Sequence, residues 1–154
     1  MKACAFFGHR DGLYEDKRQI IKEIVRDLIE KEGVNQFYIG GRGAFDSICA
    51  DIVHGLKRDF PWIKSTLVLS YIPQKDFVLS NKYDDSVYLL EKAVLPKFAI
   101  WETNKNIVDR SDFIITAVGK EWGGAYRAAR YAKAKGKRVW NVFFEKEAGF
   151  FAKM

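Results

Sequence analysis

Three glycines stand between a short apolar run and a helical pattern, and they mark the strongest candidate for chemistry in the sequence. The apolar run covers residues 37–39, and Gly40, Gly41 and Gly43 follow it. Glycine permits positive φ and leaves no Cβ between its amides and a ligand, while the following helix directs its free N–H groups at the same place. The pattern therefore indicates either an anion site, with phosphate as the expected anion, or an ordinary tight strand-to-helix turn.

Two further loops rich in glycine and polar groups also follow strand-like apolar runs. They cover residues 8–12 and 119–124, and the loop described above covers residues 40–46. If the runs form parallel strands, all three loops lie at the carboxyl edge of one sheet, where open α/β folds place their ligands. Their convergence favours a shared ligand site over a fold that merely uses glycine for its turns.

The polar side chains of these loops suit a nucleotide, and each also has a structural explanation. Arg10 carries the planar group that makes paired hydrogen bonds to phosphate, and His9 can bind phosphate, transfer a proton or brace its loop. Asp46 can accept a ribose hydroxyl, act as a base or cap the first turn of its helix. Glu121 is a second candidate acid or base, and Trp122 can stack on a base or pack in the core.

The composition is that of one folded domain over residues 1–154, with 48% hydrophobic and 15% aromatic residues. The net charge of +6 admits a nucleic-acid partner, but the basic residues alternate with acidic ones, which is typical of solvated helix faces.

No apolar run approaches the roughly 20 residues of a membrane span, so we expect a cytoplasmic protein with no membrane partner. Cys4 and Cys49 lack metal-ligand spacing and are expected to be buried, reduced thiols.

Apolar runs and helical periodicity alternate along the chain, which predicts parallel βαβ units with right-handed crossovers. Predicted strands cover residues 3–7, 37–39, 64–70, 113–118 and 139–144, and predicted helices cover residues 14–32, 45 or 46 to 56, 98–108 and 125–135. The predicted fold class is α/β, a three-layer Rossmann-like open, mainly parallel sheet with helices on both faces.

Residues 71–97 are harder to interpret, because their polar run and Pro73 lack a clear period. We expect a long loop over the carboxyl edge of the sheet, either a lid or a plain surface excursion, with one or two helical turns within residues 86–93. The apolar tail at residues 149–151 is expected to cap the fold or to contact another subunit.

Four motifs occur in one order along the chain: Gly8-His9-Arg10, GGRGAFDSICA, NKNIVDRSDFIITAV and GGAYRAARYAKAKGKRV. In this order they resemble the SLOG superfamily of Rossmann-like proteins, particularly the stand-alone branch with a Gly-His-Arg start, whose members are often recorded as domains of unknown function. The resemblance covers nearly the whole chain except residues 71–97. It implies a sensor or regulator that binds a nucleotide or nucleotide-derived ligand, and, together with the apolar tail, a homodimer or other homo-oligomer.

Some members of that superfamily, the Lonely-guy phosphoribohydrolases, cleave the base from a nucleoside monophosphate, and this chain is similar to them at Asn104-Lys105 and Gly123-Gly124. It places Arg130 where those enzymes have a glutamate and Arg127 where they have a threonine. Because these two differences remove residues that the hydrolases use, binding is the first hypothesis and an N-glycosidic hydrolase is the alternative. Smf-type members bind single-stranded DNA, which makes a single-stranded nucleic-acid-binding protein the second alternative.

The predicted site combines these lines of argument. Amides of residues 40–44 and 123–125, with Arg10 and Lys105, are expected to hold phosphate, and Asp46 is expected to hold ribose. No metal or cofactor is expected, and any catalysis is assigned to Asp46 or Glu121. The full set of predicted ligand-binding residues is Gly8, His9, Arg10, Gly40, Gly41, Arg42, Gly43, Ala44, Asp46, Lys105, Trp122, Gly123, Gly124 and Ala125.

Overall fold

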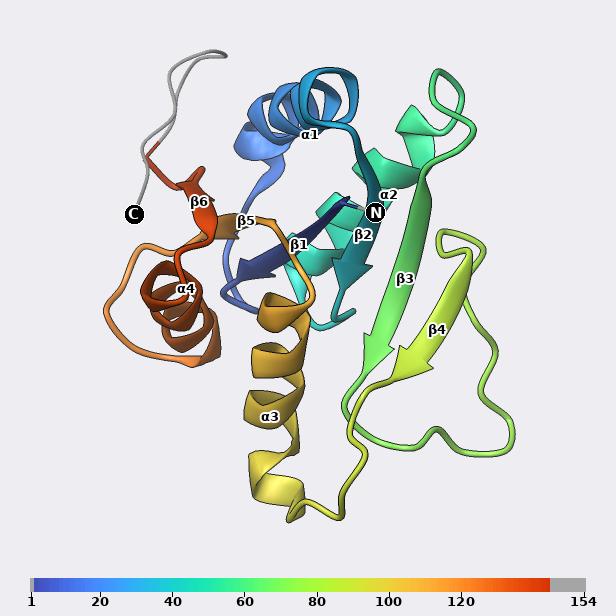
Figure 1. The fold of residues 1–154 in the computed structure, drawn as a ribbon, viewed down its shortest axis with the longest axis vertical. Helices are drawn as coiled ribbons and strands as arrows, with labels where there is room; N and C mark the ends of the chain where they lie inside the picture. Colours follow the sequence, from blue (N-terminus) through green and yellow to red (C-terminus); the bar gives the residue numbers. More distant parts are fainter. Residues whose placement is uncertain (1, 145–154) are drawn as a thin grey trace.

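The computed structural model describes residues 2–144, along which strands and helices alternate except at one place where two strands follow one another (Figure 1). Six strands form one sheet in the order β4-β3-β2-β1-β5-β6, and every neighbouring pair is parallel. This confirms the predicted open, parallel α/β sheet. In chain order the elements are β1 Lys2–Gly8, the 3₁₀ helix η1 Glu15–Lys17, α1 Arg18–Glu32, β2 Val34–Ile39, α2 Ala44–Leu56, β3 Lys64–Leu69, β4 Asp85–Tyr88, α3 Pro96–Asp109, β5 Phe113–Ala117, α4 Gly124–Ala134 and β6 Arg138–Asn141.

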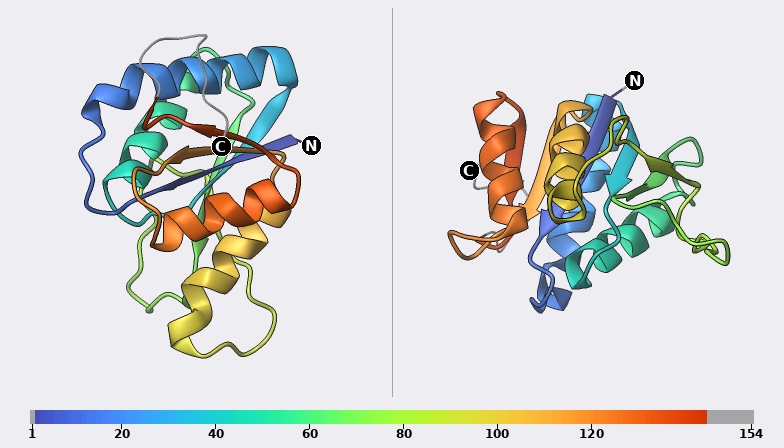
Figure 2. Two further views of the ribbon diagram at one scale, coloured as in Figure 1. Left: turned by 90° about the vertical axis from the view of Figure 1, so that its left-hand side faces the viewer. Right: turned by 90° about the horizontal axis from the view of Figure 1, so that it is seen from below.

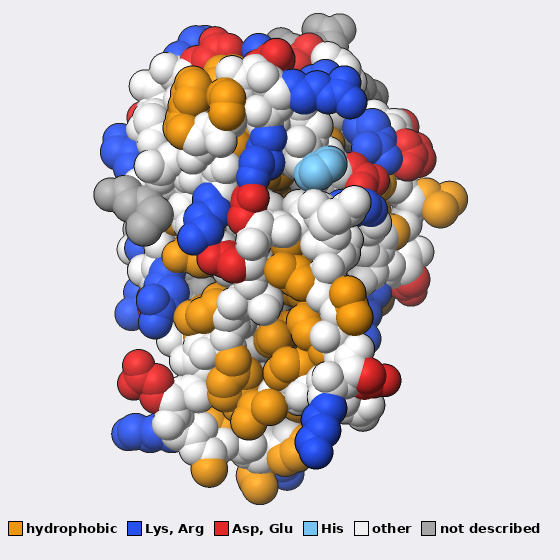
Figure 3. Space-filling view, turned by 90° about the vertical axis from the view of Figure 1, so that its right-hand side faces the viewer, with side chains coloured by type: hydrophobic (Ala, Val, Ile, Leu, Met, Phe, Trp, Pro, Cys, Tyr) orange, Lys and Arg blue, Asp and Glu red, His pale blue; other side chains and the backbone are white. Residues whose placement is uncertain are grey.

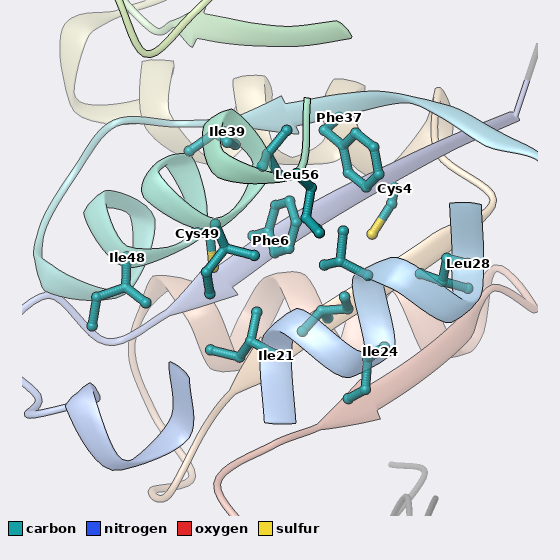
Figure 4. Packing of buried hydrophobic residues seen from close by; sticks show 14 of the residues in the cluster. Cys4, Phe6, Ile21, Ile24, Leu28, Phe37, Ile39, Ile48, Cys49 and Leu56 are labelled. Carbon is teal, nitrogen blue, oxygen red and sulfur yellow. The ribbon is translucent and has the colours of Figure 1, made fainter. Parts of the chain in front are cut away.

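The helices cover both faces of the sheet. Helices α1 and α2 pack on one face, and α3 and α4 pack on the other (Figure 2). One core cluster joins α1 and α2 to the sheet through side chains such as Ile21, Phe37 and Leu56 (Figure 4), while the other includes Ile114 and the alanines that α4 buries. The helical spacing of buried isoleucines in α1 and its left-handed Gly33 cap agree with the sequence prediction.

The central strands set the position of the site. From β1 the chain builds the sheet in one direction through β2, β3 and β4, and it then returns to add β5 and β6 on the other side of β1. The order of the strands therefore reverses between β1 and β5. In an open α/β sheet, the crevice at the carboxyl ends of two such strands is the usual place for a ligand.

The predicted helical turns within residues 86–93 are wrong, because Asp85–Tyr88 forms the edge strand β4 and the next helix begins at Pro96. Polar contacts hold this strand against β3. The Asp84 carboxylate accepts a hydrogen bond from the Ser65 amide at 2.8 Å, and Asp85 accepts one from the Thr66 hydroxyl at 2.6 Å. Because these partners lie about 20 residues away in sequence, local spacing does not reveal the strand.

The segment around β4 also presents hydrophobic side chains to solvent. Seen from the β3–β4 side, they gather in one region of the surface (Figure 3). The exposed large hydrophobic residues of this segment are Tyr71, Ile72, Phe77, Val78, Tyr88, Leu95 and Phe98. The apolar tail predicted to cap the fold or to contact a subunit lies outside the described residues.

The remaining general predictions concern membranes and thiols. Among the helices of residues 2–144, none has both the length and the apolar character needed to cross a bilayer. Cys4 and Cys49 are both buried and unbonded, as predicted, and burial raises the pKa of each thiol.

Candidate functional site

A cleft of about 620 Å³ opens at the carboxyl edge of the sheet, beside the point where the strand order reverses. Residues from all three glycine-rich loops line it, together with residues of α3. The lining consists of Phe6, Phe7, Gly8, His9, Arg10, Asp11, Gly40, Arg42, Asp46, Ile100, Asn104, Lys120, Gly123, Gly124 and Ala125. Its size falls within the range of small-molecule sites.

The N-terminus of α4 faces this cleft without a cap. Gly123 precedes the helix with φ of 95°, and no side chain makes a capping hydrogen bond there. A Cβ atom on Gly124 would meet no atom within 4 Å, so the space in front of the helix is open. The first amides of a helix have no partner within the helix, and they form an anion site when they point into a cavity.

The N-terminus of α2 is arranged differently, because its loop already uses its amides inside the protein. The Arg42 amide donates to the Asp46 carboxylate at 2.9 Å, and the Ala44 amide donates to the Arg10 carbonyl at 3.2 Å. Gly41, with φ of 70°, and Gly43, with φ of 92°, shape the turn. Neither of these glycines lines the cleft, and neither does Ala44.

Arg42 reaches across the carboxyl edge from this loop. Its guanidinium donates to the Ser70 hydroxyl at 2.8 Å and to the Asn104 side-chain oxygen at 3.2 Å. Within residues 2–144, no carboxylate lies at ion-pair distance from it. Burial lowers the pKa of Arg42, and the charge of Arg10 lowers it further, whereas the carboxylate of Asp46 acts in the opposite direction.

Asp46 lies at the floor of the same region and is only 7% exposed. Burial raises the pKa of its carboxyl group to about 6, while the hydrogen bond from the Arg42 amide and the charges of Arg42 and Arg10 act against that rise. A carboxylic acid with such a pKa in a cleft is able to exchange a proton near neutral pH.

His9 follows β1 and lies beside the N-terminus of α4. Its Nδ1 atom is 3.9 Å from the position that a Cβ on Gly123 would take, and its Nε2 atom is buried without a partner among the described residues. Partial burial lowers the pKa of His9, the charge of Lys120 lowers it further, and that of Asp11 opposes both. A buried imidazole nitrogen without a partner is an open hydrogen-bonding position beside the cleft.

Several predicted site residues do not line the cleft. Lys105 forms an ion pair with Glu102 at 2.9 Å, and Trp122 is 65% exposed with the Lys120 ammonium 5.3 Å from its ring centre. Glu121 is exposed as well. Their predicted roles in binding and catalysis stay predictions.

The cleft also contains residues that the sequence prediction omitted, namely Ile100, Asn104, Lys120, Asp11 and the ends of β1 at Phe6 and Phe7. Lys120 and Asp11 stand inside the predicted glycine loops, so their charge was a usable signal. Asn104 stands beside Lys105 in a motif that resembles the phosphoribohydrolases, so that resemblance was a usable signal. Ile100, also on α3, reaches the cleft only through the packing of that helix. Among residues 2–144, no group of three or more His, Cys, Asp and Glu side chains is placed to hold a metal ion.

No protein-family model and no curated protein matches this sequence. Solved structures with the same fold exist. The structural-genomics target TM1055 is 19% identical with a TM-score of 0.59 over 90% of this chain and 72% of its own. DNA processing protein A of Helicobacter pylori, described as binding single-stranded DNA, is 17% identical with a TM-score of 0.60 over 90% of this chain and 63% of its own.

A third similar structure is the molybdenum cofactor binding protein of the phototrophic bacterium Rippkaea orientalis. It is 17% identical with a TM-score of 0.58, over 90% of this chain and 74% of its own. At these identities the likeness establishes the shared Rossmann-like fold.

Proposed function

We propose that this protein binds a nucleotide or nucleotide-derived ligand in the cleft, as a sensor or regulator of the SLOG type. The observation that carries this proposal is the open N-terminus of α4, which faces a cavity at the reversal point of the strand order. Backbone amides in that position favour an anionic group such as phosphate.

The charges of the lining support an anionic ligand. Arg10, Arg42 and Lys120 contribute three positive charges, and Asp11 and Asp46 contribute at most two negative ones. Ile100 adds an apolar surface against which a base can pack. Other proteins with this fold are described as binding a molybdenum cofactor or single-stranded DNA, which fits a site for ligands of this general kind.

Native mass spectrometry of the purified protein, followed by denaturation and identification of any released molecule, tests the proposal first. We expect an intact nucleotide or nucleotide derivative. A thermal-shift screen of nucleotides and single-stranded oligonucleotides extends the test to weak ligands. If neither experiment detects a nucleotide-type ligand, the proposed function is wrong.

Removing a positive charge from the cleft should weaken binding of a nucleoside monophosphate. Lys120→Ala and Arg10→Ala should each raise the Kd by about tenfold or more, because a hydrogen bond to a charged group contributes roughly 1.5–3 kcal/mol. Isothermal titration calorimetry measures this effect.

The matched control for Lys120→Ala is Lys31→Ala. It removes the same charge from an exposed position on α1, where Lys31 forms an ion pair with Asp27. We expect the control to change the Kd little, because solvent and salt screen that charge. Equal effects of the two lysine variants would contradict a phosphate position beside Lys120.

A second candidate function, N-glycosidic hydrolysis, is favoured by one specific observation. Asp46 lines the cleft with its pKa raised to about 6, which suits a group that transfers a proton to or from water. In this reaction water adds across the bond between the base and the ribose, releasing the free base and a ribose phosphate.

If the protein is a hydrolase, Asp46→Asn should lower base release from nucleoside monophosphates by about 10²- to 10⁴-fold, the usual contribution of a general acid or base. Chromatographic detection of the free base measures it. Glu121→Gln tests the other predicted acid or base, and we expect a much smaller effect because Glu121 is exposed and outside the cleft lining. Absence of base release by the wild type would leave binding as the function, and loss of activity in Glu121→Gln alone would assign the chemistry elsewhere.

The nucleic-acid alternative receives less support from the surface. On the face in Figure 3, Lys and Arg side chains are interspersed with Asp and Glu around an apolar region, and they form no continuous basic stripe there. Stabilisation by single-stranded oligonucleotides alone in the thermal-shift screen would reverse this ranking. A homo-oligomer also stays a prediction.

A further inference from the structure

Arg42 is held in a fixed position by residues from two other elements. Its guanidinium bonds to Ser70, which follows β3, and to Asn104 on α3, at 2.8 and 3.2 Å. Both acceptors are neutral oxygens, so they orient the cation without balancing its charge. The guanidinium group has five N–H donors, and these two bonds leave others for a ligand.

The electrostatic surroundings of Arg42 favour an additional negative charge. Arg10 has the same sign, and Asp46 is the carboxylate that opposes it, yet Asp46 is itself engaged with the Arg42 amide. Arg42 lines the cleft, so a ligand has access to its side chain. A cation that is partly removed from water gains most from an anionic partner, with which arginine makes paired hydrogen bonds.

Asn104 supplies an independent second observation. It is only 4% exposed and lines the cleft, and its side-chain oxygen accepts the bond from Arg42. Its Nδ2 donor has no acceptor among the described residues. An amide donor without a partner that opens into a cavity is expected to meet a ligand or water there.

These donors are separated from the open end of α4. Ser70 follows β3, whereas Gly123 lies beside His9, which follows β1, and β2 lies between those two strands. Two strand spacings of about 4.8 Å place the strand ends roughly 10 Å apart. The Arg42 guanidinium lies between them, over Gly40 at the end of β2, where an added Cβ would be 3.4 Å from its Nη2 atom, and it reaches Ser70 at 2.8 Å. The free donors of Arg42 and the amides of α4 therefore lie at different strand ends and form two separate groups of donors.

We propose that Arg42 and Asn104 form a second anion subsite, so that the ligand is a nucleotide carrying a second phosphate away from its first. This inference rests on the proposed nucleotide-binding function and narrows its ligand class. In this arrangement the first phosphate lies at the N-terminus of α4, the nucleoside spans the cleft, and the second phosphate meets the Arg42 guanidinium and the Asn104 amide.

The test compares three probes in their adenosine and guanosine forms: the 5′-monophosphate, the 5′-diphosphate and the 3′,5′-bisphosphate. Calorimetry on the wild type should show the bisphosphate binding about tenfold or more tightly than the other two, as expected for a hydrogen-bonded charge pair. Arg42→Gln should remove this advantage, because it lowers the affinity for the bisphosphate much more than the affinity for the monophosphate. Asn104→Ala should reduce the advantage as well, and it serves as the second variant if Arg42→Gln does not fold.

Arg58→Gln is the matched control, because Arg58 is exposed just beyond the C-terminus of α2, at the end of that helix away from the cleft. It should preserve the preference. Equal affinity of the wild type for monophosphate and bisphosphate would overturn the second subsite. A gain in affinity over the monophosphate that depends on Arg42 but appears only with the diphosphate would overturn it too. Loss of all probes alike in both cleft variants would also overturn it. If the wild type binds none of the probes, the proposed function itself fails, and the inference fails with it.

Discussion

Gly43→Ala should lower the free energy of unfolding by about 3 kcal/mol, the sum of left-handed backbone strain and overpacking. Gly43 has φ of 92°, a conformation that side-chain-bearing residues rarely adopt. An added Cβ would lie 2.6 Å from the Arg10 Cα atom and 2.9 Å from its carbonyl oxygen. Because these are backbone atoms, no rotation of a side chain relieves the clash. Urea denaturation followed by circular dichroism measures the loss.

Gly55→Ala is the matched control for this prediction. Gly55 lies within α2, the helix that Gly43 precedes, and a Cβ there would meet nothing within 4 Å. Alanine should stabilise the helix by about 0.5–1 kcal/mol. Similar effects of the two substitutions would show that the contact between the first and second loops does not constrain the fold.

The same contact matters for the site. The Arg10 carbonyl accepts the Ala44 amide, so the close approach of Gly43 fixes the backbone that carries Arg10. A glycine at position 43 therefore links the two loops that supply Arg10 and Arg42 to the cleft.

Asp46→Asn should stabilise the protein at neutral pH and remove part of its pH dependence. In the folded state the pKa of Asp46 is raised from 3.8 to about 6, because burial disfavours the charged form. Between these pH values the folded state binds more protons than the unfolded state, so the contribution of Asp46 to stability falls as pH rises. The shift of about two pKa units corresponds to roughly 3 kcal/mol, an upper limit for the gain in the variant at pH 7.

Measurement of unfolding free energies from pH 4 to pH 7.5 checks this prediction, with the difference between wild type and variant as the readout. The pKa of some other carboxylates is lowered, so their contribution to stability rises with pH. The burial of Asp84, for example, is outweighed by bonds from Lys57 and Ser65, so its pKa is lowered. Asp76→Asn, which removes the same charge at an exposed position, is the matched control. A difference between wild type and Asp46→Asn that does not vary with pH would contradict the assignment.

A carboxylate that costs stability at neutral pH is typical of functional sites. Asparagine keeps an oxygen that can accept the Arg42 amide, so the variant retains the turn while losing the charge. Comparing its stability with its nucleotide affinity therefore separates the structural role of Asp46 from its role in the cleft.

The sequence was sufficient for the fold class because the core elements are specified locally. Buried runs such as β1 and β5 are apolar along their length, and α1 carries isoleucines at helical spacing before Gly33 ends it. The edge strand β4 was missed because it has four residues with alternating exposure and is held by Ser65 and Thr66 on another strand. Short edge strands carry little local pattern.

The sequence by itself also determined which edge of the sheet carries the glycine loops, since parallel strands place their carboxyl ends together. Only the tertiary structure decided which backbone amides are open. Asp46 and the Arg10 carbonyl occupy amides at the start of α2, while α4 stays uncapped. The position of Arg42 likewise depends on Asn104, 62 residues away, because hydrogen bonds between distant segments form only after the helices have packed on the sheet.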